Sequence, residues 1–94
     1  MLKTISASEF TQEGGKYVSP AVCIETSGAA IQVKTDAEAT VTVERAANGK
    51  DFTEVPDFSL KVTGTGEFNV VNAVRGQWIR IASTIAPVNC NILT

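Results

Sequence analysis

The sequence contains no histidine among its 94 residues. This absence removes the commonest general base, the commonest metal ligand and every Ser-His or Cys-His nucleophile pair. The two cysteines, Cys23 and Cys90, form no Cys-x-x-Cys spacing, so the usual motifs of structural zinc and dithiol redox sites are missing as well. We therefore expect a protein that is not an enzyme and that needs no metal or other cofactor.

Positive charge is scarce and scattered. Eight Lys and Arg are outnumbered by ten Asp and Glu, which leaves a formal net charge of -2. Because nucleic-acid binding depends on positive charge gathered on one face, we predict no nucleic-acid partner. No apolar run approaches the roughly 20 residues that a membrane span requires, and the N-terminal segment lacks the apolar core of a signal peptide. We expect no membrane partner and a chain that is made and kept in a cytoplasm.

Apolar and polar residues alternate with a period of two along most of the chain. Ala39, Val41 and Val43, for example, alternate with threonine and glutamate, and turn-forming residues recur roughly every ten positions. The pattern predicts an all-β fold, an antiparallel β-sandwich that is jelly-roll-like and has eight to nine short strands. We expect a single sandwich domain over residues 16–94, with residues 1–15 as an N-terminal arm or edge strand.

The order of the turns predicts which strands are neighbours. Residues 18–25 and 31–35 both alternate and flank a Ser-Gly turn signal, so we expect them to pair as a hairpin. Residues 36–38 are predicted to turn the chain into the next strand. Asn48 and Gly49 are a hairpin signal, because both tolerate positive φ.

Further along the chain, proline and glycine predict two more breaks. Pro56 has no N–H to offer a sheet, so we expect it to interrupt the strand that returns from the Asn48-Gly49 turn. Residues 64–66, Gly-Thr-Gly, are predicted to turn the chain again. Without a helical pattern after them, they are turn glycines rather than a phosphate loop.

Cys23 and Cys90 are predicted to remain free thiols. Val22 and Ile24 are expected to face inward, which turns Cys23 outward, whereas Cys90 shares the apolar face of its strand with Ile92. The two sulfur atoms therefore face different ways, and we expect one buried and one half-exposed thiol.

Acidic side chains gather near two of the predicted turns, Asp36 with Glu38 and Asp51 with Glu54 and Asp57. Carboxylates in turns usually bond the local backbone or face solvent, and we interpret both groups in this way. A calcium site in the second group is the alternative, although its spacing matches no known calcium loop.

Trp78 and Arg80 form the most distinctive pair of side chains. They alternate with Ile79 and Ile81 and so share the face of their strand that points away from the core. An indole stacked on a guanidinium would make a flat amphipathic surface able to hold a sugar ring or a partner protein. In the alternative interpretation, Trp78 packs at the rim of the sandwich and Arg80 pairs with an acid such as Glu44.

The segment from Val41 to Ser83 resembles the discoidin-type, or galactose-binding-like, β-sandwiches. Those domains have a strand with valines and Glu, a turn with Gly, an aromatic and Val on the return, and later an aromatic followed by hydrophobic-Arg-hydrophobic. The resemblance implies a β-sandwich fold and makes a small carbohydrate-binding module one candidate function. The matching positions here are Val41, Val43, Glu44, Gly49, Phe52, Val55, Trp78, Ile79, Arg80 and Ile81.

The same pattern in a short acidic chain also resembles small virion structural proteins of tailed bacteriophages, of the head-decoration, head-fibre or tail type. This resemblance implies a non-enzymatic subunit of the virion, made in the bacterial host cytoplasm, that docks on capsid or tail proteins and forms a homo-oligomer. The virion subunit is our main functional hypothesis, and the carbohydrate-binding module is the alternative. Leu2, Ile5 and Phe10 are apolar but weakly patterned, so we expect the arm, and Phe10 in particular, to take part in docking.

Overall fold

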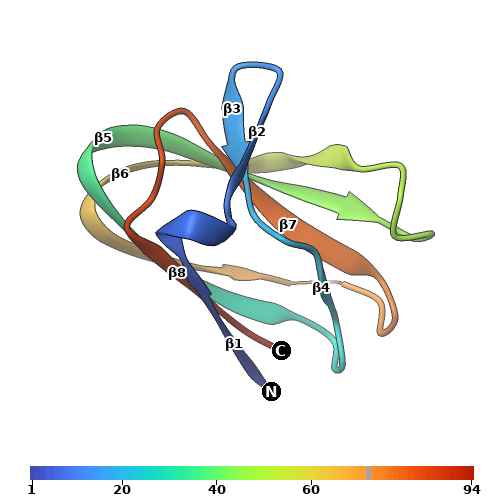
Figure 1. The fold of residues 1–94 in the computed structure, drawn as a ribbon. Helices are drawn as coiled ribbons and strands as arrows, with labels where there is room; N and C mark the ends of the chain where they lie inside the picture. Colours follow the sequence, from blue (N-terminus) through green and yellow to red (C-terminus); the bar gives the residue numbers. More distant parts are fainter. Residues whose placement is uncertain (72) are drawn as a thin grey trace.

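The computed structural model describes residues 1–71 and 73–94, without the side chains of residues 56 and 57. The described chain consists of eight strands and one short 3-10 helix, and every strand pairing is antiparallel (Figure 1). The all-β antiparallel prediction is therefore confirmed. The elements are β1 (Leu2–Ser6), η1 (Ala7–Glu9), β2 (Thr11–Glu13), β3 (Lys16–Val18), β4 (Val22–Cys23), β5 (Ala29–Ala46), β6 (Thr53–Val70), β7 (Trp78–Ser83) and β8 (Asn89–Leu93).

The strands β5 and β6 differ from the short strands predicted, because each is 18 residues long. They form one hairpin whose loop contains Asn48 and Gly49, as predicted. The side-chain Oδ1 of Asn48 accepts the backbone N–H groups of Lys50 and Asp51, both at 2.9 Å. Gly49 has φ +74°, a conformation that costs glycine little.

The hairpin bends in the middle, where the sequence predicted two turns. Thr35 pairs with Gly64 and Ala39 with Val62, so residues 36–38 of β5 face a single residue of β6. Such a bulge bends a strand without ending it. Both predicted turns are therefore wrong, because residues 36–38 and 64–66 lie inside continuous strands.

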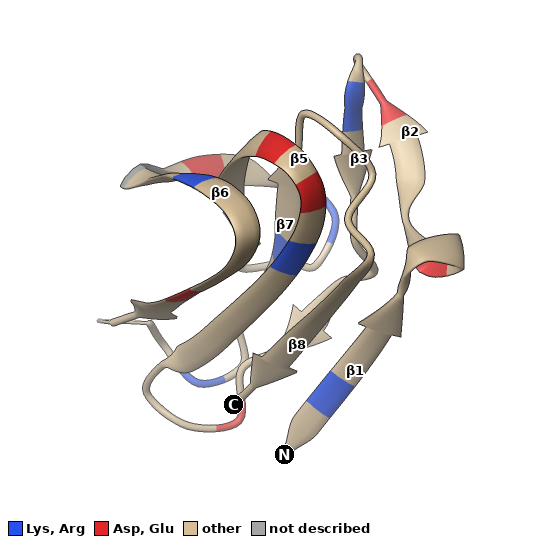
Figure 2. Cartoon of the chain, turned by 90° about the vertical axis from the view of Figure 1, so that its left-hand side faces the viewer, with Lys and Arg blue, Asp and Glu red and all other residues tan. Residues whose placement is uncertain are grey.

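The bend folds one continuous sheet into two layers, and Figure 2 shows β5 and β6 curling together between them. The first layer has the order β1-β8-β5-β6 and uses residues 29–35 of β5. The second layer contains β2, β3, β7, β5 and β6, uses residues 39–46 of β5, and has β4 paired to β7 as well. The two layers bury their facing sides against each other.

The predicted hairpin of residues 18–25 with 31–35 is wrong. Two short strands, β3 and β4, occupy this region and both pair with β7. Pro20 lies between β3 and β4 and has no N–H to donate. The backbone N–H of Ile81 on β7 is accepted here by the side-chain Oγ of Ser19 at 3.0 Å, where a paired strand would offer a backbone carbonyl. Pairing with a strand about 60 residues further along the chain has no local signal.

Pro56 does not end its strand, contrary to the prediction. β6 runs through Pro56, and β5 is the one strand paired with it in the described chain. An edge strand tolerates proline because a missing N–H on its free side loses no ladder bond. The register also shifts between Thr42 and Glu44 of β5, close to this position.

The core contains aliphatic side chains from both layers. Cys90 is fully buried among them and Cys23 is half-buried, and both thiols are free as predicted. Burial raises the pKa of the Cys90 thiol to about 12. The apolar side chains of the core with 0% exposure are Ile5, Ile24, Ile31, Val33, Val41, Val43, Ile79, Ile81, Cys90 and Ile92.

The N-terminal segment is part of the sandwich. β1 pairs along its whole length with β8, and Ile5 is fully buried. The two chain ends lie side by side, where the N-terminal ammonium donates to the Thr94 carbonyl at 2.6 Å (Figure 1). Within the described residues, no helix has the length and apolar character needed to cross a bilayer.

Candidate binding site

The outer face of the second layer holds the pair singled out in the sequence. In β7, Ile79 and Ile81 point into the core with 0% exposure, and Trp78 is 38% exposed. Arg80 is two residues from Trp78, which places the two side chains on one face about 7 Å apart along the strand. Because Trp78 and Arg80 both lie within β7, the alternation of the strand alone places them on the same face.

Arg80 is held by an acid and an aromatic ring. Its Nε donates to Glu44 Oε1 at 2.6 Å, from the position directly opposite on β5, and both side chains are about one-fifth exposed. Its Nη1 lies 3.6 Å from Glu13 Oε2 on β2. The guanidinium carbon lies 4.3 Å from the centre of the Phe52 ring, so the stacked ring is Phe52 rather than the predicted indole. The predicted pairing with Glu44 is present.

Trp78 lies beside three small residues. Ala46 and Cys23 are its register partners on β5 and β4, and Gly49 lies against the ring itself. A Cβ added to Gly49 would lie 3.1 to 3.4 Å from three atoms of the pyrrole ring. Since these distances are nearly equal, the indole presents a face to Gly49, and any side chain there would push it away.

These side chains together form what we call the Trp78 platform, which comprises Trp78, Phe52, Arg80, Glu44 and Glu13. Sequence reasoning missed Phe52 and Glu13 as members. Phe52 belongs to the loop before β6, and Glu13 comes from β2, which reaches Arg80 only because β3 joins β2 to the β7 edge. No short-range pattern could have revealed either contact.

The other predicted site residues lie elsewhere. Phe10 is partly buried and packs against the core, so its predicted docking role stays a prediction. Asp36 and Glu38 are exposed on the bulge of β5. Asp51 accepts a hydrogen bond from the Asn48 amide at 2.7 Å, and Asp57 lies outside the described side chains.

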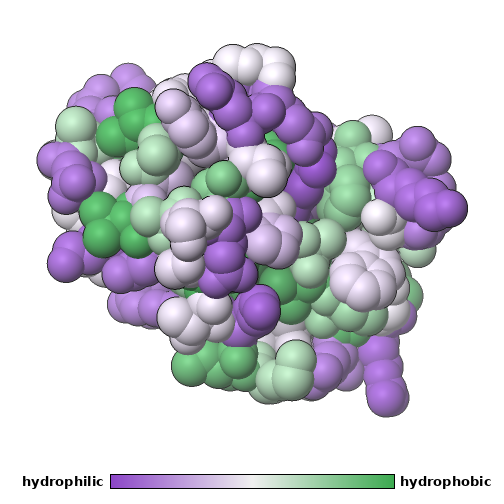
Figure 3. Space-filling model, in the orientation of Figure 1, coloured by the Kyte–Doolittle hydropathy of each residue, from purple (hydrophilic) through white to green (hydrophobic). Residues whose placement is uncertain are grey.

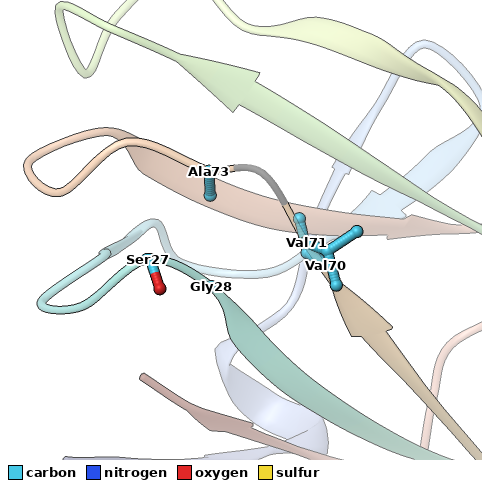
Figure 4. A pocket seen from close by; sticks show the side chains of 5 residues that line it. All are labelled: Ser27, Gly28, Val70, Val71 and Ala73. Carbon is cyan, nitrogen blue, oxygen red and sulfur yellow. The ribbon is translucent and has the colours of Figure 1, made fainter.

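The surface also has a hollow at one end of the sandwich. It is lined by Ser27, Gly28, Val70, Val71 and Ala73 (Figure 4). Among these residues Ser27 offers the one polar side chain, so the described part of the lining has no convergent polar groups of the kind that orient a small ligand. On the side of the molecule drawn in Figure 3, hydrophobic atoms form several small groups separated by hydrophilic ones.

Comparison with known proteins finds similarity in fold. No family model matches the sequence, and no curated protein is significantly similar to it. The C-terminal CBM6 of the laminarinase LamC from Zobellia galactanivorans aligns over 100% of both chains with a TM-score of 0.57 and 11% identity. PirA aligns over 99% of this chain and 90% of its own, with a TM-score of 0.50 and 10% identity. The chain therefore has the fold of known β-sandwich modules.

Proposed function

We propose that this protein is a non-catalytic carbohydrate-binding module that holds a glycan on the Trp78 platform. The observation that carries the proposal is the exposed indole of Trp78, seated by one face on Gly49 next to a stacked and ion-paired Arg80. The similarity to a carbohydrate-binding module supports a compatible fold, while the function rests on the platform.

The platform offers the two kinds of contact that a sugar ring requires. A tryptophan ring presents a negative π-face, which attracts the weakly positive C–H groups on the flat side of a sugar ring. A guanidinium has five N–H donors, and one Arg80 donor is committed to Glu44 at 2.6 Å. The remaining donors, with the oxygens of Glu44 and Glu13, can bond sugar hydroxyls beside the stacked ring.

The charge of the platform indicates which glycans it accepts. Glu13 and Glu44 lie against the guanidinium of Arg80, Glu54 is the register partner of Glu44 on β6, and Lys16 is the register partner of Glu13 on β3. These three carboxylates outnumber the two cations, so the site gives no net attraction to uronic acids or sulfated sugars. An open sheet face also suits the side of a polymer better than a small enclosed ligand. We expect neutral polysaccharides.

Affinity gel electrophoresis tests the proposal with soluble neutral glucans, xylans and galactans, and with alginate as an anionic comparison. Trp78→Ala should weaken retardation by a neutral polysaccharide on the order of tenfold, because the stacking surface is lost. Trp78→Phe should retain part of the binding. Leu93→Ala is the matched control, since Leu93 is 50% exposed on β8, away from the platform.

Three outcomes contradict the proposal. Folded wild-type protein that no polysaccharide retards would remove the function. Full binding by Trp78→Ala would remove the site, and loss of binding in Leu93→Ala alone would move it to the chain ends. Nothing in the comparisons bears on the virion-subunit prediction, which rests on the sequence resemblance alone, so we place carbohydrate binding first.

A further inference from the structure

The free edge of β6 is the longest unpaired edge of the sheet. β6 has 18 residues, and among the described residues β5 is its only partner strand. At the other ends of the sheet, β1 has five residues and β2 three. A long edge strand presents a row of unpaired backbone N–H and C=O groups that can pair with another strand.

Side chains along this edge alternate strictly on both sides of the bend. Leu60, Val62 and Phe68 point toward the core side, and the half-buried Leu60 and Phe68 line a small hollow with Phe58 and Ser59. Lys61 and Glu67 point outward and are exposed. Because the parity does not change between residues 58 and 70, a second strand could follow the edge without a shift of face.

We propose that β6 pairs with β6 of a second copy of this chain, antiparallel and about a two-fold axis at Gly64. In that register residue 61 of one copy stands opposite residue 67 of the other, and residue 60 opposite residue 68. Lys61 therefore meets Glu67 of the second copy, and the same contact occurs twice because a two-fold interface is isologous. On the core side, Leu60 meets Phe68 of the second copy and closes both hollows.

Charge complementarity selects this register. Within one chain the β5 partners of Lys61 and Glu67 are Thr40 and Gln32, which carry no charge, and no ion pair of the described residues includes either side chain. Centring the pairing on residue 61 or on residue 67 would place like charges directly opposite, which destabilises a sheet. Centring it on Gly64 pairs both charges at once.

The bend of β6 is compatible with the pairing. Gly64 has φ +83°, and the strand curves toward the core at this point. A two-fold axis perpendicular to the sheet at Gly64 maps this curve onto a curve of the same sense, so both strands bend together. The result is a β5-β6-β6-β5 ribbon shared by the two copies.

Sedimentation velocity of the full chain at a series of concentrations tests the dimer. Wild-type protein should show a monomer-dimer equilibrium. Lys61→Glu should raise the dissociation constant on the order of tenfold, because it places two glutamate pairs across the interface. The double variant Lys61→Glu/Glu67→Lys should restore the wild-type constant. Lys50→Glu in the β5-β6 loop makes the same change in net charge away from the edge and should have no effect.

Each result has a definite meaning once circular dichroism has shown that the variants are folded. A monomer at all concentrations overturns the proposal, and so does a dimer that Lys61→Glu leaves unchanged, which would place the contact on another surface. A dimer lost in both the single and the double variant overturns the register. As a second measurement, Thr63→Cys and Thr65→Cys proteins should form a disulfide when mixed and fail to do so separately, since residues 63 and 65 stand opposite in this register.

Discussion

The two halves of β5 are alike on the inside of the sandwich and different on the outside. Ile31 and Val33 in the first half, and Val41 and Val43 in the second, are all fully buried. The bend of the hairpin therefore joins two similar inner faces into one core.

Outside, the first half carries Gln32 and Lys34, which are exposed opposite Asn91 and Asn89 of β8. This face offers amides, a lysine and no aromatic ring along β5 and β8. The second half carries Glu44, which holds the guanidinium of Arg80 at 2.6 Å. The same core supports both faces, and the proposed glycan site uses the face that has the ion-paired Arg80 and the aromatic rings.

The largest expected effect is a loss of stability when the buried core that the two halves share is truncated. Ile31→Ala and Ile81→Ala, one in each layer, should each lower the free energy of unfolding by about 2–5 kcal/mol, because both side chains have 0% exposure. Urea unfolding of both variants measures this. If one layer tolerated the change while the other did not, the halves would not share a single cooperative core.

A smaller effect is expected from glycine substitutions, and it should differ between the Trp78 platform and the rest of the sheet. Gly49→Ala and Gly15→Ala both place a side chain at positive φ, +74° and +80°, which costs about 1–2 kcal/mol. A Cβ at Gly15 meets nothing within 4 Å, whereas at Gly49 it lies 3.1 Å from the indole. Only Gly49→Ala should therefore shift the Trp78 fluorescence and weaken glycan binding. Equal spectra for the two variants would mean that Gly49 does not seat the ring.

The smallest effect should be a difference in reactivity between the two thiols. Cys23 lies on the outer side of the second layer, and Cys90 lies on the inner side of the first. Cys23 is half-buried beside Trp78, whereas Cys90 is fully buried and its pKa is raised to about 12 by loss of hydration. The thiolate is the reactive form of cysteine. A disulfide reagent at pH 8 should therefore label Cys23 in the folded protein and Cys90 only in denaturant. Rapid labelling of both would show that the first layer opens readily.

Several elements of the fold could be predicted because their signals are local. Asn48 and Gly49 make a hairpin loop by their own side chain and backbone, and the alternation of β7 places Trp78 and Arg80 outward wherever that strand lies. The pairing of Arg80 with Glu44 was one of the two interpretations of Arg80, because alternation turns both side chains away from the core. Its contacts with Phe52 and Glu13 had no such signal.

The failed predictions of strand breaks share a cause. Residues 36–38 and 64–66 have the composition of turns, yet 36–38 form a bulge opposite Thr63, and 64–66 pair in register with residues 33–35 of β5. Pro56 lies in an edge strand and in the segment of β6, between Glu54 and Ser59, where the register with β5 shifts, and proline is tolerated in both situations. Each of these errors comes from interpreting a local break signal as the end of a strand, whereas the wrong hairpin of residues 18–25 with 31–35 comes from the distant pairing of β3 and β4 with β7.

The sequence alone determined which side of β5, β7 and β8 is buried, because the pleat alternates side chains with a period of two whatever the partner strand is. Tertiary structure decided which strands pair, where the sheet curls and which side chains surround Arg80. Those features depend on contacts between strand edges and side chains that are dozens of residues apart in the sequence. The free energy of such a contact depends on both segments, so neither segment alone predicts it.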